Sequence, residues 1–481
     1  MAVDAQPAAD RSGGTAATTT HPPYQSGFDN EFASEAVRGA LPHGQNNPQT
    51  PPLGLYTEQL SGTAFTVPAA RNRRTWLYRI RPSVRHAWRF TETTNHAIRT
   101  APCREADPPI GQLRWDPPPF PTHPTTFLTG IHTVATNGDA HTQRGMAAHI
   151  YMATESMTDI YVYDADGELL VVPQDGRLRF VTECGVLVVS PGEIVVLPRG
   201  MVFRVELLDD RARGYICENY GTYLELPERG PIGANGLANP RDFLYPVAAF
   251  EDHDRAGELY VKFDGRLFVV ETDHSPLDVV GWHGNHAPYK YDLSTFNVIG
   301  SISFDHPDPS IFTVLTAPSA DPGVANVDVV AFTDRWLVGE HTFRPPYYHK
   351  NIMSEFMGIV HGVYDAKEEG FSPGGMSLHN MYFPHGPDHD AWTKATTADL
   401  QPEKLSDTLS FMFETRYPLV PTAYAGSIPA LQEDYPTVWH QLERHFSGPV
   451  TADGERRIDT PSTERDRLPP DAGGGCAPPA F

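Results

Sequence analysis

The sequence predicts a mainly β protein built as jelly-roll or β-sandwich layers, and three observations carry that prediction. Proline (46) and glycine (40) together exceed a sixth of the 481 residues, a density that interrupts long helices. Short runs of alternating or β-branched residues recur between residues 76 and 223. Turn residues separate these runs at intervals of about ten residues, which is typical of β-sandwiches.

Individual elements follow from local patterns. Residues 194–197 are apolar and lie between turn sequences, Pro191-Gly192 and Pro198-Arg199-Gly200, so we expect a strand there. The run DIYVYDADGELLVV predicts two strands with Asp166-Gly167 as a hairpin turn. A second β-rich stretch covers about residues 259–270 and 296–332. The best helix candidates are AWTKATTADLQPEKL and YPTVWHQLERHF.

The length predicts two domains, because 481 residues exceed what one compact core usually holds. We expect a larger N-terminal β-rich domain at residues 24–294 and a smaller C-terminal catalytic domain at residues 295–446. Residues 1–23 and 447–481 offer little apolar surface to bury. Both are therefore predicted to be disordered tails, to which we assign no function.

Charge and cysteine content exclude several classes of function. The formal net charge is -23, from 60 acidic against 37 basic residues, so no nucleic-acid partner is expected. The four cysteines include no C-x-x-C pair and do not suggest a disulfide framework: Cys103, Cys184, Cys217 and Cys476. The N-terminus has no basic-then-apolar signal, and no apolar run approaches the ~20 residues of a membrane span. We expect a cytoplasmic protein without a membrane partner.

Five of the 21 histidines fall between residues 349 and 389, which suggests a metal site: His349, His361, His379, His385 and His389. His349 and Glu355 are six residues apart. On one strand they would lie roughly 20 Å apart, and on a helix they would occupy different faces. They can bind one ion only if the chain reverses around residues 350–354. The spacing H-x5-E-x6-G, ending at Gly362, resembles the first motif of the cupin fold, in which the ligands lie on adjacent strands.

The third ligand is left open by spacing, because His379 and His385 are about equally well placed. Two imidazoles and one carboxylate leave coordination positions free, a set typical of non-haem Fe(II). Zinc or manganese with the same ligands is the alternative. Residues 173–205 also resemble a cupin barrel but carry no histidine or carboxylate at ligand positions, so we expect scaffold there rather than a second metal site.

Longer stretches of the sequence show a more specific resemblance. TFRPPYYHKNIMSEFMG and GFSPGGMSLHNMYFPHGPD resemble the homogentisate 1,2-dioxygenase family, as do YQSGFDNEF, RRTWLYRIRPSV, VVGWHGNHAPYKYDL and FDHPDPSIFTVLT. The resemblance covers about residues 24–445. It implies a cupin-like fold and the opening of the aromatic ring of homogentisate with O2, giving 4-maleylacetoacetate in tyrosine and phenylalanine breakdown.

The resemblance also implies roles for particular residues. His349, Glu355 and His385 match the family's iron ligands, which resolves the open third position. Carried over in the same way, His306 matches an acid/base histidine, and Tyr364 matches a residue that contacts the substrate. His379 becomes a pocket residue beside His385, both of them facing the substrate. Without the resemblance, His306 would be taken for an ordinary turn histidine.

The cofactor implied is Fe(2+), which binds homogentisate and O2 side by side in an extradiol-type cleavage. The family is associated with homohexamers built as dimers of trimers, and we expect the same here. Three alternatives remain: a gentisate-type dioxygenase with the same ligands, a metal-free cupin for storage or ligand binding, and a zinc or manganese isomerase. The residues that hold the acetate group of the substrate are not assigned.

Overall fold

The computed structural model describes residues 22–85, 89–95, 97–228, 230, 237–298, 303–306, 308–364 and 370–447. Over these residues the chain is mainly β, so the predicted fold class is confirmed. The described residues up to His440 belong to one compact unit; residues 441–447 belong to a second and contain no helix or strand. Apart from residues 22, 23 and 447, the predicted tails lie outside the described residues.

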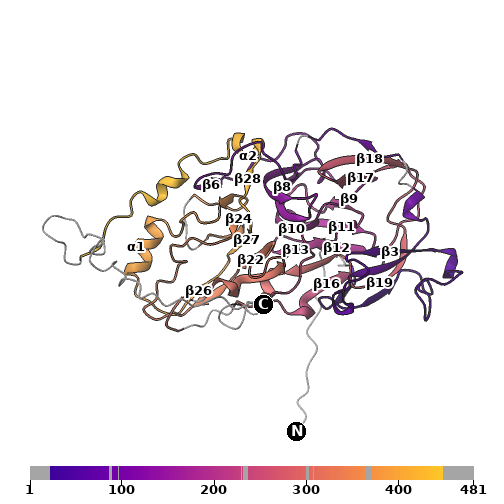
Figure 1. Cartoon of the computed structure of the whole chain (residues 1–481), viewed down its shortest axis with the longest axis horizontal. Coiled ribbons are helices and arrows are strands. Elements are labelled where there is room, and N and C mark those ends of the chain that lie inside the picture. Colours follow the sequence, from indigo (N-terminus) through magenta and orange to yellow (C-terminus); the bar gives the residue numbers. More distant parts are fainter. Residues whose placement is uncertain are drawn as a thin grey trace, which may run out of the picture. The chain divides into compact units, whose positions relative to one another are not determined.

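Two large sheets account for most of the N-terminal half (Figure 1). In order across the nine-stranded sheet, the strands are β1 (Tyr24–Ser26), β16 (Phe243–Pro246), β20 (Tyr289–Asp292), β13 (Glu193–Leu197), β10 (Glu168–Asp175), β15 (Ala212–Asn219), β8 (Arg144–Ala153), β7 (Ile131–Asp139) and β28 (Val420–Pro421). In order across the seven-stranded sheet, they are β12 (Gly185–Val189), β11 (Leu178–Thr182), β14 (Phe203–Leu207), β9 (Ile160–Asp164), β17 (Gly257–Phe263), β18 (Arg266–Thr272) and β5 (Thr91–Glu92).

Three smaller sheets complete the described strands. The six-stranded sheet of the C-terminal half contains β21 (Thr313–Ala317), β22 (Val327–Phe332), β27 (Leu409–Thr415), β24 (Ser354–His361), β25 (Met376–His379) and β6 (Gln112–Trp115). A four-stranded sheet contains β2 (Phe32–Glu35), β19 (Val279–Gly284), β4 (Arg74–Arg79) and β3 (Tyr56–Ser61). The last pair is β23 (Arg335–Leu337) with β26 (Glu403–Leu405).

Helices in the described residues are short. The α-helices are α1 (His389–Thr397) and α2 (Ala423–Ser427). Single 3-10 turns are η1 (Pro52–Gly54), η2 (Ala69–Arg71), η3 (Ser83–Arg85), η4 (Pro240–Asp242), η5 (Leu293–Thr295), η6 (Pro309–Phe312) and η7 (Tyr435–Trp439). None of the helices among the described residues has the length and apolarity that a membrane crossing requires.

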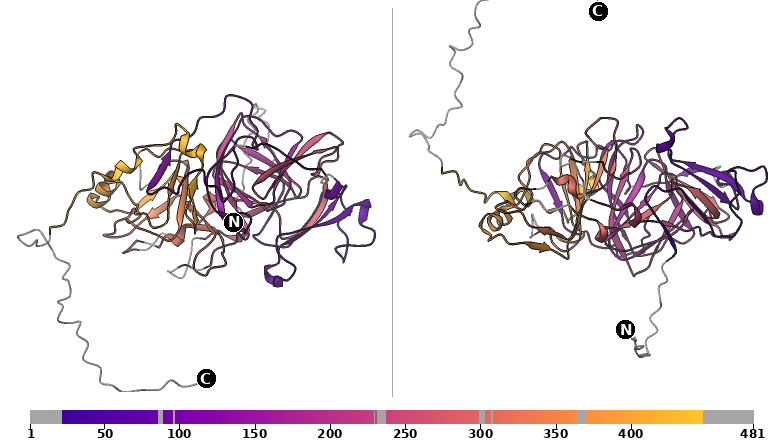
Figure 2. Two further views of the ribbon diagram at one scale, coloured as in Figure 1. Left: turned by 45° about the horizontal axis from the view of Figure 1, so that its top comes forward. Right: turned by 90° about the horizontal axis from the view of Figure 1, so that it is seen from below.

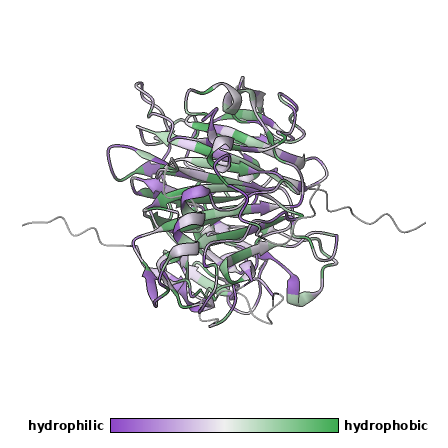
Figure 3. Ribbon diagram, turned by 90° about the vertical axis from the view of Figure 1, so that its left-hand side faces the viewer, coloured by the Kyte–Doolittle hydropathy of each residue, from purple (hydrophilic) through white to green (hydrophobic). Residues whose placement is uncertain are grey.

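The nine-stranded sheet is buried on both faces, which explains its continuous apolar strands. In β13, Val195 and Leu197 pack in a core with residues of the seven-stranded sheet, such as Phe180. Ile194 and Val196 point the other way, into the core shared with the C-terminal sheet. Because neighbouring side chains on a strand face opposite sides, such a strand needs apolar residues at every position. Figure 3 shows green, hydrophobic stretches along many of the strands.

The two halves of the chain exchange strands. β6 comes from the N-terminal half yet pairs with β25 at the edge of the C-terminal sheet. In return, β28 from the C-terminal half pairs with β7. Figures 1 and 2 show the purple strand β6 among the orange strands of the C-terminal half. The halves are therefore interlocked, although each has its own sheets.

Three local predictions are corrected. The expected hairpin at Asp166-Gly167 is wrong, because β9 pairs with β14 and β17, whereas β10 pairs with β13 and β15. The turn instead carries the chain from one sheet to the other. The expected helix over residues 391–405 ends with α1, and residues 403–405 form β26 after Pro402, which lacks a helical N–H donor. In the other helix candidate only η7 forms.

Candidate metal centre

The C-terminal sheet places the carboxylate of Glu355 in the middle of its inner face. Glu355 is the second residue of β24, between His379 on β25 and Glu414 on β27 in the strand register. Directly opposite residues on antiparallel strands point to the same face, so these three side chains share it. Only about 4% of the surface of Glu355 is exposed.

His349 and His385 are held together by their own backbones. The amide N–H of His349 donates to the carbonyl of His385 at 2.9 Å, and that of His385 donates back at 3.1 Å. Between His349 and β24 the chain turns back, as the six-residue spacing required. The Nε2 atom of His349 consequently lies 3.8 Å from Oε1 of Glu355.

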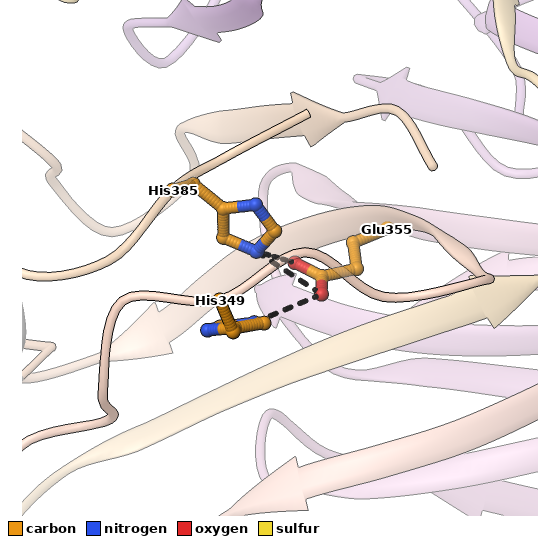
Figure 4. A group of neighbouring side chains, drawn as sticks. All are labelled: His349, Glu355 and His385. Atoms are coloured by element: carbon orange, nitrogen blue, oxygen red, sulfur yellow. Dashed lines mark hydrogen bonds and ion pairs between the residues drawn. The ribbon is translucent and has the colours of Figure 1, made fainter. Parts of the chain in front are cut away.

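The three side chains converge on one point (Figure 4). Nε2 of His385 lies 3.1 Å from Oε2 and 3.3 Å from Oε1 of Glu355. One potential ligand atom from each of His349, Glu355 and His385 falls within 4.8 Å of the others. His379 is a near neighbour: its ring stacks on that of His385 at 4.7 Å, and its Nδ1 lies 3.3 Å from Oε2 of Glu355.

Surrounding groups fix how these ligands point. Nδ1 of His349 lies 2.7 Å from the carbonyl of Tyr347, and Nδ1 of His385 lies 3.0 Å from that of Phe383. A carbonyl only accepts, so each Nδ1 carries a proton, and each Nε2 is the atom that would offer its lone pair to a metal ion. Nδ2 of Asn351 donates to Oε1 of Glu355 at 2.7 Å. These contacts suit a divalent metal ion, which requires neutral imidazoles and an ionised carboxylate.

The electrostatics favour an ionised Glu355. Burial is the largest single effect and raises the pKa of this carboxyl. Hydrogen bonds from His349, His379 and His385 together lower it by more, so the pKa lies well below the ordinary value. Burial and the charge of Glu355 raise the pKa of the neighbouring Glu414 well above its ordinary value. Burial also raises the pKa of Asp328, the next carboxyl in this row, to about 6.

The centre opens into a cavity of about 320 Å³. All six residues predicted from the sequence line it: His306, His349, Glu355, Tyr364, His379 and His385. The ring of His306 lies 5.1 Å from that of Tyr347, which lies 5.8 Å from His349. The ring of Tyr364 packs edge-on against Phe332 at 5.6 Å. The volume is in the lower range for small-molecule sites.

Some residues of the site carried no signal in the sequence. Tyr435, on η7, has its hydroxyl 3.1 Å from Nε2 of His379. Glu414 lines the cavity but lies in an ordinary strand sequence. Asn351 could have been noticed from its place between two candidate ligands, but Tyr435 and Glu414 come from distant segments. The cavity also contains basic side chains that were not predicted: Arg335, Arg344 and Lys350.

Comparisons with known proteins extend this description. A family model described as "Homogentisate 1,2-dioxygenase N-terminal" matches residues 23–293, and one described as "Homogentisate 1,2-dioxygenase C-terminal" matches residues 294–446. The chain is 60% identical over 425 residues to a homogentisate 1,2-dioxygenase of Rhodopseudomonas palustris (strain TIE-1), covering 88% of this chain and 95% of that protein. A homogentisate 1,2-dioxygenase of Rhizobium leguminosarum bv. trifolii is 59% identical over 440 residues, covering 91% and 97%.

Solved structures give more distant matches. A cupin 2 conserved barrel domain protein from Leptotrichia buccalis has a TM-score of 0.26 and 8% identity, covering 59% of this chain and 88% of that chain. An oxalate decarboxylase from Bacillus subtilis has a TM-score of 0.29 and 12% identity, covering 71% and 90%. Matches this distant say nothing about the activity.

Proposed function

The chain belongs to the homogentisate 1,2-dioxygenase family, and from that premise we propose that it opens the ring of homogentisate at an Fe(II) centre held by His349, Glu355 and His385. The reaction consumes one O2 and gives 4-maleylacetoacetate, with both oxygen atoms retained in the product. The alternative of a gentisate-type enzyme is not favoured, because the homogentisate 1,2-dioxygenases named above match nearly the whole chain.

The observation that carries the proposal is the convergence of two imidazole Nε2 atoms and one buried carboxylate at the floor of a cavity. This donor set suits Fe(II) and leaves positions for other ligands. When bound, the ion would supply Lewis acidity toward a phenolic oxygen and electron transfer toward O2. Zinc and manganese accept the same ligands, so the choice of iron is part of the proposal.

The protein's own groups would bind, orient and deprotonate the substrate. We assign proton transfer to His306, since an imidazole on the cavity wall can accept a proton from a phenol and return it. Tyr364, which also lines the cavity and packs against Phe332, would contact the substrate. His379, fixed between Tyr435 and Glu355, would form the wall behind His385. Arg335, Arg344 and Lys350 line the cavity together with three acidic residues, and their positive charges would attract an anionic substrate.

Further properties belong to the same proposal. We propose a homohexamer, as expected for the family, and a division into domains near residue 294. A cytoplasmic location is supported by the cysteines Cys103, Cys184 and Cys217, which are free.

Oxygen consumption with a panel of substrates tests the activity. Turnover of homogentisate, with the ring-opened product identified by mass spectrometry, is the expected result. Turnover of gentisate but not homogentisate would overturn the assignment. Metal analysis after anaerobic purification tests the cofactor: iron is expected, whereas activity that survives under argon would indicate an isomerase with another metal.

A further inference from the structure

Strand β6 comes from the N-terminal half, yet only β25 separates it from the strand that carries Glu355. In the pairing of β6 with β25, Gln112 stands directly opposite His379. Directly opposite residues point to the same face, so Gln112 shares the inner face of the sheet with His379 and Glu355. Arg114, two residues further along, faces the same side. Both side chains of β6 are buried. This strand therefore presents two buried polar groups beside the metal centre.

Gln112 holds the segment that carries His385. Its Nε2 donates to the carbonyl of Pro384 at 2.5 Å. Pro384 directly precedes His385, and the carbonyl of Phe383, one residue earlier, lies 3.0 Å from Nδ1 of His385. The hydrogen bond from Gln112 thus fixes the peptide group that joins Pro384 to the ligand, next to the carbonyl that orients the imidazole ring.

Arg114 supports His379 through Tyr435. The guanidinium carbon of Arg114 lies 4.2 Å from the ring centre of Tyr435, a cation–π contact. Its Nε donates to Oε1 of Gln432, and its own carbonyl accepts the N–H of Gln432 at 2.9 Å, which fixes the segment that leads into η7. The hydroxyl of Tyr435 lies 3.1 Å from Nε2 of His379. Nδ1 of His379 lies 3.3 Å from Oε2 of Glu355, so a series of contacts connects Arg114 to the carboxylate ligand.

We propose that Gln112 and Arg114 are positioning residues of the metal centre, by which the N-terminal half of the chain orients ligands on the C-terminal sheet. The inference rests on the metal centre proposed above and extends it to a strand that contributes no ligand. Packing alone would be served by apolar side chains at these two positions, because a buried polar group costs free energy unless it is hydrogen-bonded. Groups that orient metal ligands, by contrast, raise the affinity for the ion.

The reciprocal strand β28 offers a matched control. Thr422 directly follows β28, is buried, and its hydroxyl donates to the carbonyl of Thr133 on β7 at 2.7 Å. Like Gln112, it donates from one half of the chain to a backbone carbonyl of the other half, but β7 carries none of the proposed ligands. Thr422 also caps α2. Thr422→Val should therefore lower the melting temperature at least as much as Gln112→Leu does.

The test measures Fe(II) affinity under argon, by competition with a chelator, on the full chain. Gln112→Leu and Arg114→Met should each bind Fe(II) about 10–100-fold more weakly than wild type, whereas Thr422→Val should bind it as wild type does. The visible absorption of bound Co(II), which depends on the geometry of its ligands, should change in Gln112→Leu and not in Thr422→Val. Circular dichroism verifies folding. If Arg114→Met does not fold, Arg114→Lys replaces it, since lysine keeps the charge but not the planar stacking group.

A double variant tests whether Arg114 acts through Tyr435. Tyr435→Phe keeps the ring that stacks on Arg114 and removes the hydroxyl that contacts His379. Arg114→Met/Tyr435→Phe should lose no more Fe(II) affinity than Tyr435→Phe alone, because residues that act through one contact are not additive. Losses that add in the double variant would overturn this role of Arg114.

The outcomes separate this inference from the proposed function. If wild type binds neither Fe(II) nor Co(II), the proposed metal centre fails and the positioning role fails with it. If wild type binds Fe(II) and both variants of β6 bind it equally well, the positioning role alone is refuted and the proposed function stands. An equal loss of affinity in Thr422→Val would also refute the positioning role, because the loss would then follow from destabilisation of the fold.

Discussion

The C-terminal centre and a buried cluster in the N-terminal half, in which Asp164, Asp166 and Glu218 surround Lys262, balance the charge of buried acidic groups in different ways. Each brings three ligand-capable side chains within 4.8 Å of one another inside a β-sandwich. The C-terminal centre uses two imidazoles and one carboxylate and opens into a cavity of about 320 Å³. The N-terminal cluster uses three acidic side chains around a lysine, which also lines a cavity of about 40 Å³ and a hollow of about 400 Å³. In the first site a metal ion would complete the charge balance; in the second the ammonium of Lys262 does so.

The difference teaches what separates a reactive site from a structural one in this protein. A buried carboxylate needs a positive partner, and a lysine provides one permanently. A metal ion provides one with free coordination positions, at which chemistry can occur. The C-terminal sheet has no lysine or arginine paired with Glu355 in the described part of the chain, so that carboxylate depends on histidines and on an ion from outside.

The largest expected effect is at the C-terminal carboxylate. Glu355→Ala should abolish iron retention and lower kcat by at least about 10³-fold, because one of three ligands is lost. Iron content per chain and oxygen uptake with homogentisate are the measurements, with circular dichroism to verify folding. Normal iron content in this variant would refute the ligand assignment.

His306→Ala should separate metal binding from proton transfer. We expect kcat to fall by about 10²–10⁴-fold, the usual contribution of a general acid or base, while iron content stays normal. His123→Ala, at an exposed histidine, is the control and should leave both unchanged. Loss of iron from the His306 variant would mean that a ligand had been mistaken for a base.

Lys262→Met should destabilise the fold without removing the catalytic ion. Breaking a buried ion pair from one side costs about 3–5 kcal/mol in the free energy of unfolding, since it leaves uncompensated charge. Urea denaturation in EDTA measures it, with Lys290→Met as the comparison at a single-carboxylate pair. A loss no larger than that of Lys290→Met would argue against a special role for the three-carboxylate cluster.

Asn351→Ala tests how far the C-terminal centre depends on its support. Asn351 donates to Glu355, and loss of such a contact typically weakens metal binding by about 10–100-fold. Competition with a chelator gives the affinity. Asn297→Ala, at an exposed asparagine that donates to the carbonyl of Thr295, should bind iron normally. Unchanged iron affinity in Asn351→Ala would show that Glu355 does not need the hydrogen bond from Asn351 to bind the metal ion.

The smallest effect concerns stability in acid and depends on His149, a buried imidazole whose Nε2 lies 3.1 Å from Oε2 of Glu218 in the Lys262 cluster. Burial, with the charge of Lys262, lowers the pKa of His149 to about 3. Below pH 6.5 the unfolded chain therefore binds a proton at this residue, whereas the folded chain does not. The contribution of His149 to the free energy of unfolding is therefore complete above pH 6.5. It falls by about 1.4 kcal/mol for each pH unit below that value. His149→Gln should reduce that slope between pH 6.5 and 5. An identical slope would mean that His149 is protonated in the fold.

Much of the fold could be predicted because it is encoded locally. The strand β13 was readable from residues 194–197 and their flanking turns, since alternation and turn residues act over a few positions. The turn at Asp166-Gly167, which leads from one sheet to the other, could not be predicted, because the same turn residues also form hairpins within one sheet. The exchange of β6 and β28 between the halves was equally hidden, since edge pairing depends on which sheet has a free edge.

The sequence alone determined the β class, the candidate ligands His349 and Glu355, and, through its long matching words, the family. Only the tertiary structure decided which side chains surround them. Tyr435 contacts His379, which lies 56 residues away in the sequence. Lys262 contacts Glu218, 44 residues away, and Asp166, 96 residues away. Local patterns set backbone conformation and which face a side chain takes. The partner of a buried charge, by contrast, is chosen by packing and strand register, which no short stretch of sequence contains.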